Sequence, residues 1–405
     1  MRKDTVLEKL IKAELHRQES SINLIPSENY VSREMLAVVG SALTNKYSEG
    51  YAGKRYYPGN AVYDAIETLA QERIKKMFRL GKDWHVNVQP HSGSSANMAA
   101  YLALMQPHET FVGMALASGG HLTHGHRVSS TGRLFHAVQY GLDSEGVIDY
   151  AEAERLIETH KAKMIVSGAT SYPRTIDFSR FGKIAKKTGI YHMADISHIA
   201  GLVAAGLHPS PFPHADIVTS TTHKTLRGPR GAFIACRRDF ADRIDRVIFP
   251  GMQGGPHNHV TAGIARMGFE GLLPTFKKYQ TQIIKNAQAL AKALIKEGLT
   301  LVSGGTDNHL MLIDCKGAGM TGMEAQDALE VAGITANRNS IAGDASPFYP
   351  TGIRLGTPAV TTRGMKEREM ARIASWMARV IIVKENPIKM RKEIAALCAT
   401  FPIYS

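Results

Sequence analysis

A lysine follows a hydroxyl-rich segment near the middle of the chain. Residues 217–222 read Ile-Val-Thr-Ser-Thr-Thr, and Lys224 stands two residues later, before a loop broken by glycine and proline. A strand that ends in small hydroxyl side chains presents hydrogen-bonding groups at a sheet edge, where open α/β sheets bind their ligands. Burial of a lysine at such an edge favours its neutral amine, a nucleophile that forms a Schiff base with an aldehyde. A lone lysine after a strand is more often a solvated surface charge, so other residues must support this chemistry.

Two segments upstream supply what such a site would need. Asp195 ends the short apolar run 191–194, and His198 follows three residues later. A carboxylate beside a pyridine nitrogen keeps the ring cationic, and a histidine can pack on the ring. Residues 92–94 read Ser-Gly-Ser before a helical pattern over 98–105, and backbone N–H groups at a helix start bind phosphate. Each segment alone has a plainer explanation, such as a helix cap, but together and in this order they match a site for pyridoxal phosphate (PLP).

Several blocks of the sequence resemble serine hydroxymethyltransferase, a family of fold-type I PLP enzymes. The blocks are residues 24–29, 45–51, 53–57, 89–97, 119–125, 195–206, 221–231, 251–256 and 352–358. They occur in the family's order, and the resemblance extends over nearly the whole chain. A single lysine motif would be weak support, whereas a long ordered series of blocks is strong. The resemblance implies a PLP-dependent hydroxymethyltransferase that reversibly converts L-serine and tetrahydrofolate to glycine and 5,10-methylenetetrahydrofolate.

The resemblance also implies roles for individual residues, with PLP as cofactor, tetrahydrofolate as cosubstrate and no metal. The residues expected to bind PLP are Tyr47, Ser92, Gly93, Ser94, His121, Thr170, Asp195, His198, His223, Lys224, Gly254 and Gly255. The residues expected to be catalytic are Lys224, Glu49, His121, Asp195, His198, Thr221 and Tyr57. The amino acid would be bound by Ser27, Tyr57 and Arg354, and the folate by Glu49, Leu116, Gly120, Leu122 and Asn339.

The family match further implies a homodimer with shared active sites. Residues 45–60 are rich in Tyr, Gly, Lys and Arg and poor in aliphatic side chains, which is typical of a loop. By resemblance this loop, with Gly254 and Gly255, serves the cofactor of the neighbouring subunit, and Glu49 is its acid–base carboxylate. The sequence does not separate a dimer from a tetramer. A predicted helix over 5–18 carries an apolar face, which packs either on its own domain or, as the resemblance implies, on the neighbouring subunit.

The chain departs from the family pattern in several places near these residues. The departures are Ala52, Pro58-Gly59-Asn60, Thr170, Ser197, His257-Asn258 and a loop over 341–346 that is about one residue short. Ala52 and Pro58-Gly59-Asn60 leave the backbone path of the 45–60 loop, and hence the position of Glu49, open. The sequence also leaves open whether serine, allo-threonine or an α-methylated serine is the preferred amino acid.

Arg354 stands between Ile353 and Leu355 in an expected strand. An arginine among aliphatic neighbours needs an anion, and its planar fork suits a carboxylate. That carboxylate is either the amino acid's own, as the resemblance implies, or an internal Asp or Glu.

Composition limits the classes of protein that the chain can be. Its 405 residues, 44% hydrophobic and 21% charged, suit a soluble protein of two domains. The net charge is 49 − 36 = +13, but Lys and Arg are scattered, which disfavours a nucleic-acid partner and suits acidic small molecules. The three cysteines are far apart and fit a reducing cytoplasm and no metal spacing. No signal peptide or membrane span is expected.

Two alternatives remain open at this level. A folate-independent PLP aldolase or transaldolase for 3-hydroxy amino acids would need only the PLP part of the site. A nucleic-acid-binding protein would exploit the net charge of +13.

Apolar runs and amphipathic helical stretches alternate between about residues 85 and 235. The expected strands are 110–114, 162–166, 191–194, 217–220 and 232–236, and helices are expected over 150–159 and 178–188. This alternation predicts an α/β fold with a mainly parallel sheet, and the resemblance implies seven strands in an aspartate-aminotransferase-like large domain. We expect an N-terminal arm over 1–25, a large PLP-binding domain over 26–271 and a smaller α+β domain over 272–405.

Overall fold

The computed structural model describes residues 4–344 and 349–404. The chain forms two compact units: the small unit, Met1–Tyr30 with Gln282–Ser405, and the large unit, Val31–Thr281. The N-terminal residues therefore group with the C-terminal part of the chain. The domain boundaries expected after residues 25 and 271 stay a prediction, and residues 345 and 346 of the shortened loop lie outside the described residues.

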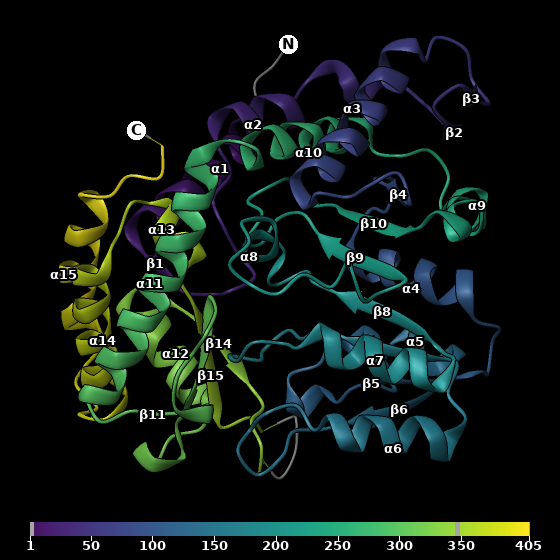
Figure 1. Cartoon of the computed structure of the whole chain (residues 1–405). Helices are drawn as coiled ribbons and strands as arrows, with labels where there is room; N and C mark the ends of the chain where they lie inside the picture. The colour runs from purple at the N-terminus through teal and green to yellow at the C-terminus, as the bar shows by residue number, and fades with distance from the viewer. Residues whose placement is uncertain (1–3, 345–348, 405) are drawn as a thin grey trace. The chain divides into compact units, whose positions relative to one another are not determined.

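A seven-stranded sheet forms the centre of the large unit (Figure 1). In the order in which they pair, its strands are β4 (Trp84–Asn87), β10 (Ala232–Arg237), β9 (Ile217–Thr221), β8 (Tyr191–Asp195), β7 (Met164–Ser167), β5 (Thr110–Met114) and β6 (His136–Tyr140). The strands from β9 to β6 are parallel, while β10 runs antiparallel to both of its neighbours. Strands β7 and β9 are buried along their whole length, as apolar strands covered on both faces should be. The predicted α/β fold with a mainly parallel seven-stranded sheet is confirmed.

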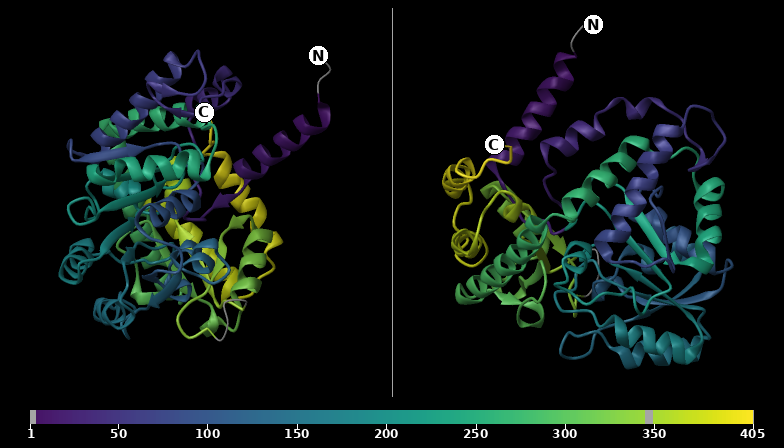
Figure 2. Two further views of the ribbon diagram at one scale, coloured as in Figure 1. Left: turned by 90° about the vertical axis from the view of Figure 1, so that its right-hand side faces the viewer. Right: turned by 45° about the horizontal axis from the view of Figure 1, so that its top comes forward.

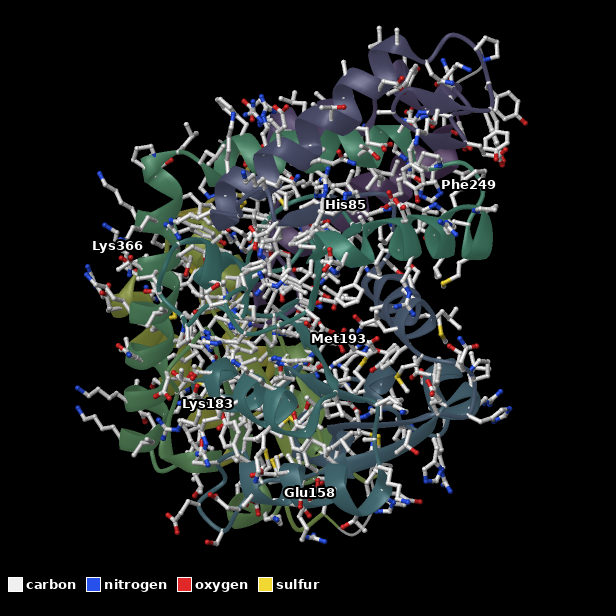
Figure 3. The ribbon with its side chains drawn as sticks, turned by 45° about the vertical axis from the view of Figure 1, so that its right-hand side comes forward. His85, Glu158, Lys183, Met193, Phe249 and Lys366 are labelled. Atoms are coloured by element: carbon white, nitrogen blue, oxygen red, sulfur yellow. The ribbon has the colours of Figure 1, made fainter. Side chains whose placement is uncertain are left out.

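Helices cover both faces of this sheet. The connection from β4 to β5 runs across the sheet in one direction, and the connections from β6 through β7 and β8 to β9 run in the opposite direction. Because such crossovers are right-handed, α4 lies on one face of the sheet and α6 and α7 lie on the other (Figure 1). Figure 3 shows Met193 among the side chains of the sheet and Lys183 and Glu158 on the outer helices. The helices of the large unit are α2 (Arg33–Val39), α3 (Ala61–Phe78), α4 (Gly93–Leu104), α5 (Ser130–Leu134), α6 (Tyr150–His160), α7 (Phe178–Thr188), α8 (Ala200–Ala204), α9 (Ala241–Arg246) and α10 (Asn258–Gly271).

The segment over 45–60, which was expected to be a loop, contains regular structure, and a helical turn follows α9. Within 45–60, β2 (Gly50–Tyr51) pairs with β3 (Lys54–Arg55) in a short hairpin. Gly50 has a φ of +92°, and a Cβ there would lie 2.4 Å from the carbonyl oxygen of Lys54, so this turn requires glycine. The segment Val247–Met252 continues from α9 as a further helical turn in which Phe249 is extended.

The small unit is built on an antiparallel sheet. Its strands pair in the order β11 (Thr300–Leu301), β12 (Leu310–Asp314), β15 (Gly352–Gly356) and β14 (Asn337–Asn339), and β1 (Ile22–Asn23) pairs in parallel with β13 (Ile334–Thr335). Its helices are α1 (Thr5–Ser20), α12 (Gly322–Ala332), α13 (Pro358–Thr362), α14 (Glu367–Ile381) and α15 (Ile388–Ala399), and α11 (Pro274–Lys296) contains the boundary between the units. Leu329, Ile353 and Met377 share its buried apolar core.

The N-terminal helix α1 leaves its apolar face uncovered in the single chain (Figure 2). It begins where the Asp4 side chain accepts the N–H of Leu7, and none of its residues is buried. Val6, Leu10 and Ile11 are 60–69% exposed. Among the described residues, no helix has both the length and the apolar character needed to cross a membrane.

Candidate active site

Asp195 ends β8 at the carboxyl edge of the sheet and is 7% exposed. Its Oδ1 accepts the N–H of Ser197 at 3.0 Å, and its Oδ2 accepts Nδ2 of Asn97 at 2.8 Å and lies 3.3 Å from Nε2 of His124. Burial opposes ionisation, but the hydrogen bonds that His124 and Asn97 donate, together with the nearby imidazole of His121, outweigh it. These groups hold the pKa of Asp195 well below its usual value, so the carboxyl is a carboxylate at neutral pH.

His124 is oriented toward this carboxylate by the backbone. The N–H of His121 donates to Nδ1 of His124 at 3.2 Å, so that nitrogen is an acceptor. In the neutral ring the proton then resides on Nε2, from which His124 donates to Asp195. The ring of His121 is held in turn by Thr123, whose Oγ1 lies 2.7 Å from Nδ1 of His121.

Asn97, on α4, joins the ends of three segments. Its Nδ2 donates to Asp195 and to Oγ1 of Thr123, both at 2.8 Å, and its Oδ1 accepts the Thr219 hydroxyl at 2.7 Å. Thr219 is also the residue that pairs with Asp195 between β8 and β9. One buried amide therefore fixes α4, the turn at Thr123 and the two strand ends that bracket the site.

Lys224 lies in a loop that is tied to the segment following Asp195. The N–H of Thr221 donates to Oγ of Ser197 at 3.0 Å, and Oγ1 of Thr225 donates to the carbonyl of His198 at 2.9 Å. Lys224 itself is partly buried. The structure thus brings Asp195, His198, Thr221 and Lys224 to the same sheet edge.

The start of α4 lies against the same segment. A Cβ on Gly93 would lie 2.6 Å from Cγ2 of Thr221, so only glycine fits there. Ser92 and Ser94 are exposed, and the first N–H groups of a helix lack intrahelical acceptors and carry partial positive charge. This end of α4 can therefore receive a phosphate beside the strand that leads to Lys224.

His223 adds an unsatisfied polar atom beside Lys224. Its Nδ1 is buried and has no hydrogen-bond partner in the described part of the chain. Burial, together with the charges of Lys224 and Arg230, lowers the pKa of His223 to about 3, so the ring is neutral.

The loop that holds the expected folate contacts is tightly folded. A Cβ on Gly120 would lie 2.0 Å from the carbonyl oxygen of Met114, so this position admits only glycine. The N–H of Thr170 donates to the carbonyl of Gly119 at 2.7 Å, which ties this loop to the segment after β7. Leu116 and Leu122 begin the short helical turns Leu116–Ser118 and Leu122–His124, and Leu122 is 43% exposed.

Tyr47, Glu49, Gly254 and Gly255 form a second group in the large unit. A Cβ on Gly254 would lie 3.1 Å from Oε1 of Glu49 and 3.5 Å from the hydroxyl of Tyr47, and Gly255 faces the Tyr47 ring. The ring of Tyr57 packs edge-on against Tyr47, with centroids 5.2 Å apart. Both tyrosines are exposed, so this group presents polar side chains at the surface of the single chain.

Three expected site residues belong to the small unit. Arg354 on β15 is 8% exposed, its Nε donates to Oδ1 of Asn337 at 3.2 Å, and burial lowers its pKa to about 10. The segment before Ser27 runs beside the end of β15, because the N–H of Gly356 donates to the carbonyl of Leu24 at 2.7 Å. Asn339 ends the neighbouring strand β14.

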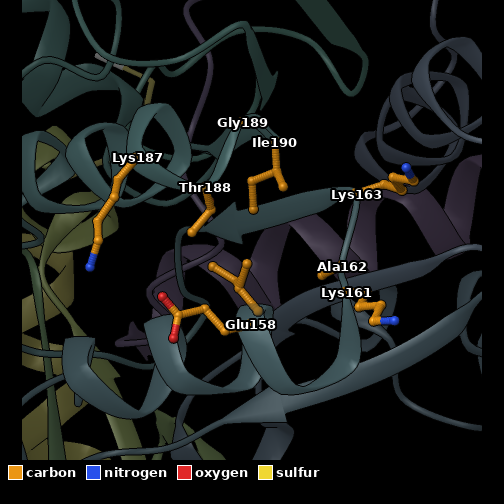
Figure 4. Close-up of a pocket in the computed structure, with 9 residues that line it drawn as sticks. Glu158, Lys161, Ala162, Lys163, Lys187, Thr188, Gly189 and Ile190 are labelled. Atoms are coloured by element: carbon orange, nitrogen blue, oxygen red, sulfur yellow. The ribbon is translucent and has the colours of Figure 1, made fainter.

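A surface pocket of about 410 Å³ lies elsewhere in the large unit (Figure 4). The C-terminal ends of α6 and α7 line it, together with the residues that lead into β7 and β8. Its lysines are Lys187 at the end of α7 and Lys161 and Lys163 between α6 and β7. Helix C-termini carry partial negative charge, so lysines there neutralise the dipoles. The pocket lies at the amino ends of these strands, whereas Asp195 stands at the carboxyl end of β8.

Sequence reasoning assigned no role to Asn97, His124, Arg55 or Asn258. Asn97 is an amide within the otherwise apolar stretch Ala96–Ala103, and the structure buries it. A polar side chain at a position that should be buried indicates a specific hydrogen-bonding role, so the sequence did contain a signal for Asn97. His124 gave no local signal, because its role depends on a strand that begins 67 residues later in the chain. The contacts of Arg55 and Asn258 depend likewise on distant segments.

A comparison with protein-family models bears on what this edge does. The model described as serine hydroxymethyltransferase matches residues 1–377. The match includes both groups in the large unit and, in the small unit, Ser27, Asn339 and Arg354. This chain belongs to the serine hydroxymethyltransferase family.

Proposed function

We propose that Lys224 and the residues around it bind PLP and that Arg354 binds the carboxylate of the amino acid. As a member of its family, the chain is a PLP-dependent one-carbon transferase that interconverts serine and glycine, with tetrahydrofolate as cosubstrate.

The residues at the carboxyl edge of the sheet fit PLP. The start of α4 offers N–H groups for the phosphate, Asp195 offers an ionised carboxylate for the ring nitrogen, and Lys224 offers an amine for the aldehyde. The buried, unsatisfied Nδ1 of His223 adds a polar atom that a ligand could satisfy. When bound, PLP supplies an electron sink for the charge released as the Cα–Cβ bond of serine breaks.

Asp195 keeps the ring nitrogen protonated by remaining a carboxylate. His124 and Asn97 stabilise that charge and fix the two carboxylate oxygens, so the carboxylate does not have to reorganise. His121 would pack on the ring of bound PLP, and Thr123 holds the imidazole of His121 in place. Thr170, Thr221 and His198 line the remaining edge.

Glu49 holds or moves the proton at the departing hydroxymethyl group or at the folate nitrogens. Tyr47, Gly254 and Gly255 contact the cofactor phosphate of a neighbouring subunit, and Tyr57 contacts the amino acid. The exposure of this group, and of the apolar face of α1, supports a homodimer with shared sites. Leu116, Gly120, Leu122 and Asn339 are the residues that would bind the folate. The buried, unpaired state of the three cysteines supports a reducing cytoplasm.

Arg354 binds the α-carboxylate of the amino acid, with Ser27 beside it. The support is the burial of its guanidinium in an apolar strand, where a planar anion would offset the loss of hydration.

The observation that carries the proposal is the buried carboxylate of Asp195 on a segment bonded to the Lys224 loop. Borohydride reduction of the holoenzyme and peptide mass mapping should place the cofactor on Lys224. Lys224→Ala should lose that label and multiple turnover, whereas Lys163→Ala, an exposed control, should keep both. A label on another lysine would refute the assignment.

A further inference from the structure

The segment that carries Tyr47 and Glu49 is held from behind at three carbonyl groups. Burial alternates along this segment: Tyr47 is exposed and Glu49 partly exposed, whereas Ser48 and Gly50 are buried. Nδ2 of Asn258 donates to the carbonyl of Lys46 at 2.7 Å. Nη1 of Arg55 donates to the carbonyls of Ser48 and Gly50, on either side of Glu49, at 2.9 and 2.6 Å.

Asn258 uses both ends of its amide on this segment. Its Oδ1 accepts the hydroxyl of Ser48 at 2.6 Å, and Ser48 is fully buried. Asn258 is itself 6% exposed and is the first residue of α10, four positions after Gly254. Asn258 therefore bonds the buried side of the Tyr47–Glu49 segment. It also stands at the end of the glycine loop, residues 253–257, in which Gly254 and Gly255 face Glu49 and Tyr47.

Arg55 is anchored by two carboxylates. Its Nε donates to Asp64 at 2.8 Å and its Nη2 to the buried Glu67 at 2.9 Å, both on α3. Gln89 adds a bond from its Nε2 to the carbonyl of Gly50 at 2.9 Å. The Arg55 side is thus fixed through α3. Gln89 also connects this segment to the glycine loop, because its carbonyl accepts Nε2 of Gln253 at 2.9 Å. Asn258 is the residue that bonds the segment directly at Lys46 and Ser48.

The glycine loop has a second attachment on its other side. Oε1 of Gln253 accepts the N–H of His91 at 3.1 Å, and the rings of His91 and His257 stack with centroids 3.9 Å apart. The loop between Gln253 and Asn258 is therefore pinned at both ends, with Gly254 and Gly255 left facing Glu49 and Tyr47.

We propose that Asn258 is a positioning residue for hydroxymethyl transfer. It locks the Tyr47–Glu49 segment onto the Gly254–Gly255 loop, so that the chain presents these four residues as one preassembled group. The proposal rests on the proposed role of Glu49, and it explains why a polar amide is buried at this helix start.

The test compares Asn258→Leu with a matched buried asparagine. Asn286 is fully buried, and its Nδ2 donates to Thr361 and to the carbonyl of Met365 in the small unit. Asn258→Leu should lower kcat for serine roughly ten- to a hundredfold, because small misplacement of a catalytic group has effects of that size. KM for serine should change little. Asn286→Leu should lower the melting temperature while kcat stays near wild type.

A measurement on the apoprotein separates positioning from loaded-enzyme activity. Hydrogen exchange of the peptide over 45–57 should accelerate in Asn258→Leu and stay unchanged in Asn286→Leu. Ser48→Ala, which removes one of the two bonds, should give a smaller change in the same direction and serves if Asn258→Leu does not fold.

Unchanged exchange and kcat in Asn258→Leu would overturn the proposal. So would a fall in kcat that merely follows lost stability in both asparagine variants. The proposed role of Glu49 fails separately, if Glu49→Gln keeps full activity; the exchange measurement still reports whether Asn258 holds the segment.

Discussion

Nε2 of His124 lies 3.3 Å from Oδ2 of Asp195, and both side chains are buried. Because the N–H of His121 occupies Nδ1 of His124, the neutral ring can donate to Asp195 without taking up a proton. The carboxylate is therefore stabilised by a fixed donor.

Replacing this donor should weaken cofactor binding. His124→Leu removes one hydrogen bond to an ionised group, which costs about 1.5–3 kcal/mol. The affinity of the apoprotein for PLP should fall roughly ten- to a hundredfold by equilibrium titration. His192→Leu removes a buried histidine that bonds Ser167 and the carbonyl of His214, away from Asp195, and should lower stability while leaving PLP affinity near wild type. Equal losses of affinity in both variants would contradict the assignment.

Shared active sites predict recovery of activity on mixing two inactive variants. In a mixed dimer of Lys224→Ala and Glu49→Gln, one site receives Lys224 from one chain and Glu49 from the other, and so carries neither lesion. Random exchange of subunits should restore about a quarter of wild-type activity.

The control for this experiment is a mixture of Lys224→Ala with the double variant Lys224→Ala/Glu49→Gln, which can form no intact site. Subunit exchange is verified by native mass spectrometry of tagged chains. Exchange without recovery would argue that Glu49 serves its own chain's cofactor.

The main sheet was predictable from the sequence because its strands are compact apolar runs. The run over 110–114 matches β5, and Asp195 falls at a strand end where the change from apolar to polar residues places it. The start of α4 was less visible, because its serines and glycine have weak helix propensity, yet Oγ of Ser95 accepts the N–H of Ser92 and starts the helix at Gly93.

The polar contacts of the site could not be predicted because they join distant parts of the chain. Thr219 bonds Asn97 across 122 positions, and Ser48 bonds Asn258 across 210. Hydrophobic periodicity assigns faces of helices and strands but does not say which buried polar groups will meet. The pairing of β1 with β13 also joins distant parts of the chain and could not be predicted for the same reason. This pairing places the N-terminal residues in the small unit.

His192 should make the large unit less stable in mild acid. Its ring is fully buried between Ser167 and the carbonyl of His214, and burial lowers its pKa from 6.5 to about 4. As the pH falls below about 6.5, His192 becomes protonated in the unfolded chain but stays neutral in the folded chain. The free energy of unfolding therefore falls until about pH 4, where the folded chain is protonated as well. The full loss is about 3 kcal/mol at 1.36 kcal/mol per pKa unit.

Urea unfolding at several pH values measures this loss. His192→Gln should flatten the dependence between about pH 6.5 and 4 relative to wild type. Ser167→Ala, which removes a hydrogen-bond partner but keeps the ring, should be less stable throughout and retain the slope. An unchanged slope in His192→Gln would assign the acid sensitivity to other groups.

Arg354→Lys distinguishes a substrate clamp from a structural arginine. The substitution keeps the positive charge but loses the planar two-point fork, and with it a charge-assisted hydrogen bond worth about 1.5–3 kcal/mol. If the anion is the carboxylate of serine, serine binding should weaken roughly ten- to a hundredfold, at about 1.4 kcal/mol per decade. PLP affinity should barely change, because the start of α4 belongs to the large unit. If Arg354 instead bonds only groups of its own unit, the variant should melt at a lower temperature and keep the serine KM of wild type. Arg338→Lys, an exposed arginine on β14, should change neither quantity, so serine kinetics and thermal melting on these two variants decide the role of Arg354.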